Sequence, residues 1–130
     1  MTSKELLARL GEVVTGLSFP SERDAPVEVL EFGAGEPSEE AVRAKLQAPA
    51  DAPVETETVE ALLAPLLAAP EDGGVEPDQA ARYQEAAALL RDHLEAARVY
   101  RVGKVEVDVL VLGKHADGAW LGLRTRVVET

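Results

Sequence analysis

The sequence has 130 residues, 46% of them hydrophobic and 28% charged, which is ordinary for one globular domain with its own core. It contains no cysteine, which excludes disulfides and thiolate metal sites, and no apolar run approaches the roughly 18 residues of a membrane span. The formal net charge of -11 would repel a polyanion, so direct binding of nucleic acid is not expected. The amino-terminal segment is charged, unlike a signal peptide, and we expect a cytoplasmic location.

The charge is sorted along the chain. Residues 22–60 hold 11 acidic and 3 basic side chains, whereas residues 98–126 hold 3 acidic and 6 basic ones. Two interpretations are open: the basic side chains line the solvent face of a sheet, or the molecule is dipolar and carries an acidic binding face. Such a face would attract cationic partners, including proteins that themselves bind phosphates.

The amino-terminal region predicts a helix followed by a strand. Thr2 and Glu5 have the spacing of a capping box, which begins a helix over residues 3–15. Gly16 is a typical helix stop, and a polar loop follows. The alternation of residues 27–32 then indicates a strand.

The middle of the chain predicts two further helices. Ser38 can cap a short helix that ends near Leu46, and the proline-containing stretch 47–53 is expected to be irregular. Thr58 can cap a second helix. Pro65 would kink or break that helix, because proline removes an amide donor.

The last part of the chain predicts the longest helix and then a sheet. A helix is expected over residues 77–97, from an apolar stripe at steps of three and four. That stripe consists of Tyr83, Ala87, Leu90, Leu94 and Ala97. Strands are expected over residues 99–102, 105–112 and 120–128, with a turn at residues 115–119 between the last two.

The sheet is expected to be covered on both faces. Valines alternate along residues 105–111, and Leu110 and Leu112 make the opposite face partly apolar as well. The predicted fold class is therefore α+β, an α/β/α sandwich with an antiparallel sheet flanked by helices. Residues 1–130 are expected to form a single domain.

Signals for catalysis are poor. Glu106 and Asp108 face the same side of a strand, so a carboxylate pair for acid–base chemistry in a small hydrolase is conceivable, but a polar face paired with Arg or Lys is favoured. His93 in the long helix and His115 in the turn are both expected to be solvated. We expect no enzyme activity, no cofactor and no intrinsic metal site.

The carboxyl end is the most suggestive local feature. The last predicted strand runs almost to Thr130, so the hydroxyl and carboxylate oxygens there would be held at a defined place, and Glu129 adds another carboxylate. Hard oxygen ligands of this kind suit Mg²⁺. Alternatively, Thr130 is merely the end of a strand.

Two regions carry a resemblance to a known family. VYRVGKVEVDVLVLG (99–113), TRVVET (125–130) and GLSFPSE (16–22) followed by the PVEV strand resemble the family of sugar-nonspecific nuclease A inhibitors. The resemblance covers about the first 32 and the last 32 residues. It implies an α/β/α sandwich that blocks the active site of a non-specific DNA/RNA endonuclease of the ββα-metal class in a one-to-one complex.

The resemblance also implies site residues. Thr130 would reach the catalytic Mg²⁺ of the partner nuclease, and Glu22 would meet an active-site arginine. In the middle loop the family uses a Gln and a Trp after a Pro. Here Glu71 and Asp72 follow the proline, and the Trp is missing. The expected nuclease-binding residues are Glu22, Glu71, Asp72, Glu129 and Thr130, in a protein that is a monomer when free.

The alternative function is a generic acidic protein–protein interaction module with a different basic partner. The absent aromatic residue of the middle loop favours that alternative, because aromatic side chains often anchor interfaces.

Overall fold

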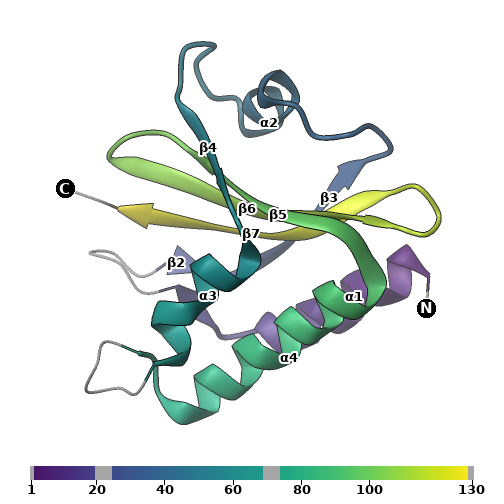
Figure 1. The fold of residues 1–130 in the computed structure, drawn as a ribbon, viewed down its shortest axis with the longest axis vertical. Coiled ribbons are helices and arrows are strands. Elements are labelled where there is room, and N and C mark those ends of the chain that lie inside the picture. Colours follow the sequence, from purple (N-terminus) through teal and green to yellow (C-terminus); the bar gives the residue numbers. More distant parts are fainter. Residues whose placement is uncertain (1, 20–24, 69–73, 129–130) are drawn as a thin grey trace.

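The computed structural model describes residues 2–19, 25–68 and 74–128. Four helices and a five-stranded sheet dominate these residues (Figure 1). The helices are α1 (Ser3–Val14), α2 (Glu39–Leu46), α3 (Val59–Leu67) and α4 (Pro77–His93). The strands are β1 (Ser18–Phe19), β2 (Ala25–Pro26), β3 (Glu28–Gly33), β4 (Val54–Glu57), β5 (Leu94–Val102), β6 (Glu106–His115) and β7 (Trp120–Val128).

The sheet has the strand order β3-β7-β6-β5-β4, and every neighbouring pair is antiparallel. The β6–β7 hairpin forms its centre, in register from Glu106 opposite Val128 to Lys114 opposite Trp120. The short strands β1 and β2 pair only with each other in a separate ladder. The predicted α+β class is confirmed.

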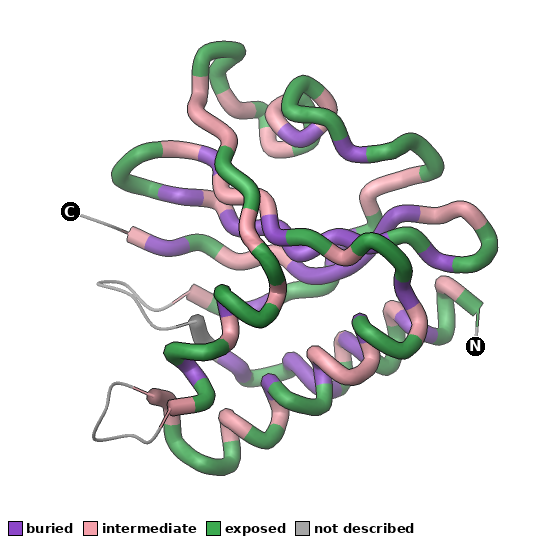
Figure 2. Tube along the Cα trace, in the orientation of Figure 1, coloured by how far each residue is buried: buried purple, intermediate pink, exposed green. Residues whose placement is uncertain are grey.

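Both faces of the sheet are covered, as predicted. Helices α1, α3 and α4 lie on one face, and α2 lies on the other (Figure 1). Val109 and Val111 of β6 are buried in the larger core beneath the three helices, while Leu110 and Leu112 are buried in the smaller core on the α2 side. Figure 2 shows the resulting buried band along the middle of the sheet and the inner side of α1 and α4. The alternation of strand side chains therefore builds the α/β/α sandwich.

The predicted helix caps are all present. The Thr2 hydroxyl accepts a hydrogen bond from the amide of Glu5 at 3.1 Å, and the Glu5 carboxylate accepts one from the amide of Thr2 at 3.1 Å. Ser38 and Thr58 each accept from the amide three residues further on. These side chains satisfy amides that have no partner within the first turn, which fixes where the helices begin.

The predicted end of the longest helix is wrong. The helix ends at His93, and β5 begins at Leu94, which pairs with His115. Ala96 adopts φ 54° within a register shift of β5. Leu94 is buried in the strand, as it would have been in the helical stripe, so helical spacing did not distinguish one further helical turn from the start of a strand.

Two features of the middle segment also differ from expectation. Residues 54–57 form the edge strand β4, which pairs with β5; four residues with two glutamates carry little strand signal. Pro65 does not break α3, which continues to Leu67. Proline removes a single amide donor there, close to the end of the helix.

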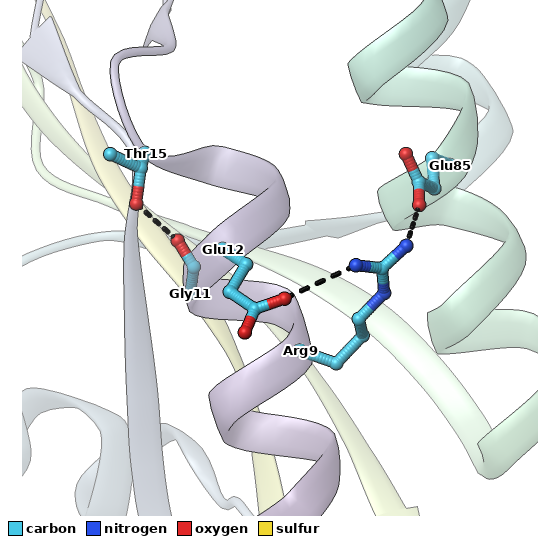
Figure 3. A network of polar contacts seen from close by, with 5 residues as sticks. All are labelled: Arg9, Gly11, Glu12, Thr15 and Glu85. Atoms are coloured by element: carbon cyan, nitrogen blue, oxygen red, sulfur yellow. Dashed lines mark hydrogen bonds and ion pairs between the residues drawn. The ribbon is translucent and has the colours of Figure 1, made fainter.

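An arginine links the two long helices. Arg9 of α1 forms ion pairs with Glu12, at 3.2 Å on its own helix, and with Glu85 of α4 (Figure 3). Arg9 and Glu85 are about half exposed and Glu12 is more exposed still, so the apolar contacts beneath them supply most of the helix packing. Among the described helices, none has the length and apolar character to cross a bilayer.

Candidate functional site

Each of the predicted nuclease-binding residues lies outside the described residues. These residues are Glu22, Glu71, Asp72, Glu129 and Thr130. The structure describes the segments that flank them, namely β1 and β2, the end of α3 with Gly74, and the end of β7 at Val128.

The flanks of residues 20–24 and of residues 129–130 lie side by side. The Thr125 hydroxyl of β7 donates a hydrogen bond to the carbonyl of Pro26 in β2 at 3.1 Å. Thr125 precedes Val128, the last described residue, by three positions. Figure 1 shows β2 next to the end of β7, on the left side of the molecule. We call this side of the sheet, where β7 ends and β6 begins, the open end.

Local sequence explains how the flanks of residues 20–24 are fixed. Gly16 adopts φ +81°, a conformation that favours glycine, and turns the chain after α1. Leu17 and Val27 are both buried, and the amide of Val27 donates to the carbonyl of Leu17 at 3.1 Å. Two buried residues joined by a backbone hydrogen bond therefore hold both arms of this connection.

The flanks of residues 69–73 lie on the same side of the molecule. The amide of Val75 donates to the carbonyl of Leu66 at 3.0 Å, and Leu66 is buried in the same core as Val27 and Val127. In Figure 1, α3 descends on the left, below β2 and the end of β7. The predicted site residues belong to three segments, residues 20–24, 69–73 and 129–130. The described flanks of all three therefore lie on one side of the fold.

A mixed-charge cleft of about 250 Å³ opens beside these flanks. We call it the β2–β7 cleft; its lining residues are Ala25, Pro26, Glu28, Asp108, Arg124, Thr125 and Arg126. Arg126 Nε lies 3.3 Å from Asp108 Oδ1, and their side chains are 52% and 19% exposed. Within the described part of the chain, Arg124 forms no ion pair. Sequence reasoning singled out Asp108 but neither Arg124 nor Arg126, although the basic excess of residues 98–126 was a signal for them.

Glu106 and Asp108 do not form a catalytic pair. Asp108 is ion-paired with Arg126, while Glu106 is exposed and does not line the cleft. The favoured interpretation, a polar strand face paired with arginine, agrees with this geometry. The described residues also contain no group of three or more His, Asp or Glu side chains placed to hold a metal ion.

The expectation of a solvated turn histidine is wrong. His115 is 7% exposed, and its Nδ1 accepts a hydrogen bond from the amide of Asp117 at 3.3 Å. This hydrogen bond gives a backbone amide of the β6–β7 turn an acceptor. His93, expected within the long helix, is its last residue and is half-buried.

Asp117 connects this turn to the start of α1. The Ser3 hydroxyl and the amide of Ala119, 3.0 Å from Asp117 Oδ1, hydrogen-bond the carboxylate and lower its pKa to about 2. Both donors stabilise the charged form of the carboxyl group. We call this side of the sheet, at residues 115–119, the closed end.

A larger groove of about 580 Å³ lies between α3, α4 and the start of β5. Its walls are mainly apolar, with Leu63, Leu67, Ala87 and Leu94 among the lining residues. Glu60, Gln84 and Arg91 also line the groove. Leu67 is exposed at this groove. The described lining residues do not point to a particular class of ligand.

The sequence model of nuclease A inhibitor-like proteins matches residues 4–130, nearly the whole chain. No curated protein matches the chain in sequence.

Proposed function

The chain belongs to the nuclease A inhibitor-like family, and we propose that it inhibits a non-specific endonuclease of the ββα-metal class by blocking the active site. The single observation that carries this proposal is the family match over residues 4–130. The chain is accordingly proposed to be a cytoplasmic protein without enzyme activity of its own. It would be a monomer when free and form a one-to-one complex with the nuclease.

The proposed mechanism is mimicry of the nucleic-acid backbone. A nuclease that ignores sequence binds phosphates through cationic side chains and a metal ion. Glu22 would pair with an active-site guanidinium in a charge-assisted hydrogen bond. Thr130 would place an oxygen atom on the catalytic Mg²⁺ in place of a phosphate oxygen or water, with Glu129 beside it. Inhibition would be exclusion of substrate, without a covalent step.

The positions of the described flanks support this mechanism. β2 and β7 carry residues 20–24 and 129–130 on adjacent strands, joined by the hydrogen bond from Thr125 to Pro26. The flanks of residues 69–73 lie on the same side of the molecule. One partner surface placed against the open end would therefore be within reach of all three segments.

The middle segment is where the choice of nuclease would differ from that of other family members. Glu71 and Asp72 offer carboxylates where the family has an amide and an aromatic contact. The nuclease should therefore present a cationic side chain opposite this segment. The acidic excess of residues 22–78 would also speed the encounter, an effect that weakens as salt rises.

The test is an inhibition assay with several purified ββα-metal nucleases, Mg²⁺ and plasmid DNA. We expect at least one nuclease to be blocked at a one-to-one ratio, with slower association at high salt. Full cleavage by every nuclease at excess inhibitor would overturn the proposal.

The alternative is a generic acidic interaction module with another basic partner, favoured by the missing aromatic residue of the middle segment. Affinity capture from the native host separates the two functions. Recovery of a metal-dependent nuclease supports inhibition, whereas reproducible recovery of a basic protein without nuclease activity supports the alternative.

A further inference from the structure

The β2–β7 cleft presents positive charge at the open end of an acidic molecule. Arg124 and Arg126 are two positions apart on β7, so both side chains lie on the same face of the sheet. Their register partners on β6 are Leu110 and Asp108, on the face that also carries α2. No residue of α2 lines the cleft, so this part of the face is open to a partner.

The charges in the cleft are only partly paired with each other. Asp108 Oδ1 lies 3.3 Å from Arg126 Nε, and this is the single ion pair among the described residues of the cleft. Glu28 stands opposite Arg124 in the β3–β7 register but forms no ion pair with it. The Arg124 guanidinium, a planar group with five donors, is thus the best candidate to bind an acceptor from outside the chain.

The position of the cleft ties it to the proposed interface. Ala25 and Pro26 in its wall directly follow residues 20–24, and Arg126 precedes Val128 by two positions. A nuclease docked against the described ends of β2 and β7, as the proposed function requires, would lie beside the cleft. Because Mg²⁺ is bound in proteins mainly by oxygen ligands, carboxylates among them, acidic side chains are expected near the metal of that nuclease.

We propose that the β2–β7 cleft is a further contact with the nuclease, in which Arg124 binds an Asp or Glu side chain at the margin of the nuclease metal site. This inference rests on the proposed function. The arginine offsets the repulsion that a molecule of net charge -11 would otherwise exert on that carboxylate. Arg126, held by Asp108, forms the wall of the cleft and keeps its charge next to Arg124.

The test compares Arg124→Glu and Arg124→Gln with Arg91→Glu. Arg91 is 72% exposed on α4, away from the cleft, and its reversal changes the net charge by the same amount. Inhibition constants are measured against a nuclease that the unaltered protein inhibits. We expect Arg124→Glu to weaken inhibition by on the order of 10-fold or more and Arg124→Gln by about 3-fold. Arg91→Glu should stay within about 2-fold.

The controls separate this inference from the function on which it rests. Thermal unfolding checks that each variant is folded. If Arg124→Glu does not fold, the neutral Arg124→Gln variant provides the comparison. If the unaltered protein inhibits and the Arg124 variants match Arg91→Glu, the cleft contact is overturned and the inhibitor function stands. If the unaltered protein inhibits no nuclease, both proposals fall.

A second arm identifies the partner group. Carboxylates bordering the metal site of the inhibited nuclease are changed one at a time to Lys. One such change should restore inhibition by Arg124→Glu. If none does, the partner of Arg124 is not a carboxylate, and the proposal is overturned.

Discussion

The two ends of the sheet use polar side chains in opposite ways. At the closed end, His115 and Asp117 bind backbone amides of their own turn, and Asp117 also meets Ser3 of α1. At the open end, Arg124 lacks an ion pair within the described chain, and Arg126 is about half exposed. The closed end thus uses these side chains to bind its own backbone, whereas the open end leaves the Arg124 guanidinium without an ion pair among the described residues.

This contrast separates stability from recognition along one hairpin. Hydrogen bonds within a turn, such as the one that the buried His115 accepts, stabilise a single conformation, and removing one partner lowers stability. Exposed charges contribute little to stability and much to the choice and speed of partner binding. Changes at the closed end should therefore alter unfolding, and changes at the open end should alter inhibition.

The largest effect, on both stability and inhibition, is expected from a change in the middle of β7, between the two ends. A Cβ atom at Gly122, in the middle of β7, would lie 1.7 Å from the carbonyl oxygen of Val111 on β6. Gly122→Ala should therefore cost about 3 kcal/mol or more of the free energy of unfolding and abolish inhibition as well. Urea unfolding measures this cost. Gly35→Ala is the control, since nothing lies within 4 Å of its Cβ position; equal stability of the two variants would contradict the β6–β7 register.

Deletion of Thr130 should have the next largest effect, and it should weaken inhibition without changing stability. Loss of the proposed metal contact is expected to raise the inhibition constant on the order of 100-fold, the size of a strong interface contact. The midpoint of thermal unfolding should not change. Thr130→Ala keeps the main-chain oxygens, so it should lose less than the deletion does. Unchanged potency after the deletion would rule out the metal contact.

Much of the fold could be predicted because local signals and tertiary contacts agree. The Thr2–Glu5 capping box fixed the start of α1, and the alternation of Val109 and Leu110 predicted a sheet covered on both faces. The start of β5 could not be predicted. Leu94 fits a helical stripe and a strand equally well, and its pairing with His115, 21 positions away, decides between them.

The sequence predicted the type of candidate site, but it did not predict the cleft beside it. The resemblance indicated Glu22 and Thr130, and the described flanks of both share the open end. The cleft was not predicted, because Asp108 pairs with Arg126 only through the β6–β7 register, and the approach of β2 places both residues in one cleft with Arg124. Charge counting along residues 98–126 signals an excess of arginine and lysine without showing where these side chains gather.

A smaller effect on stability is expected from His115→Ala at the closed end. The change leaves the amide of Asp117 without its acceptor and opens space in the turn, which should cost about 1–2 kcal/mol in the free energy of unfolding. Inhibition should be unaffected, because residues 115–119 lie at the opposite end of the hairpin from Val128. Lys114→Ala, at an exposed neighbour, should stay within about 0.5 kcal/mol. A loss of inhibition without a loss of stability would break the contrast between the ends.

The smallest effect concerns the pKa of Asp117. Its pKa is about 2 in the folded protein, against an ordinary 3.8 that we take for the unfolded chain. The ionised carboxylate therefore stabilises the folded state above about pH 4, and this contribution is lost as the pH falls toward 2. Ser3→Ala removes the largest cause of the shift and should raise the pKa part of the way, since the amide of Ala119 still donates.

A pH titration of the Asp117 carboxyl carbon by NMR measures this change. Ser38→Ala, which alters the cap of α2, is the matched control and should leave the pKa of Asp117 where it is. An unaltered pKa in Ser3→Ala would assign the shift to the turn alone. The low pKa of Asp117 would then come from the hairpin itself, and α1 would not be anchored to the turn through Asp117.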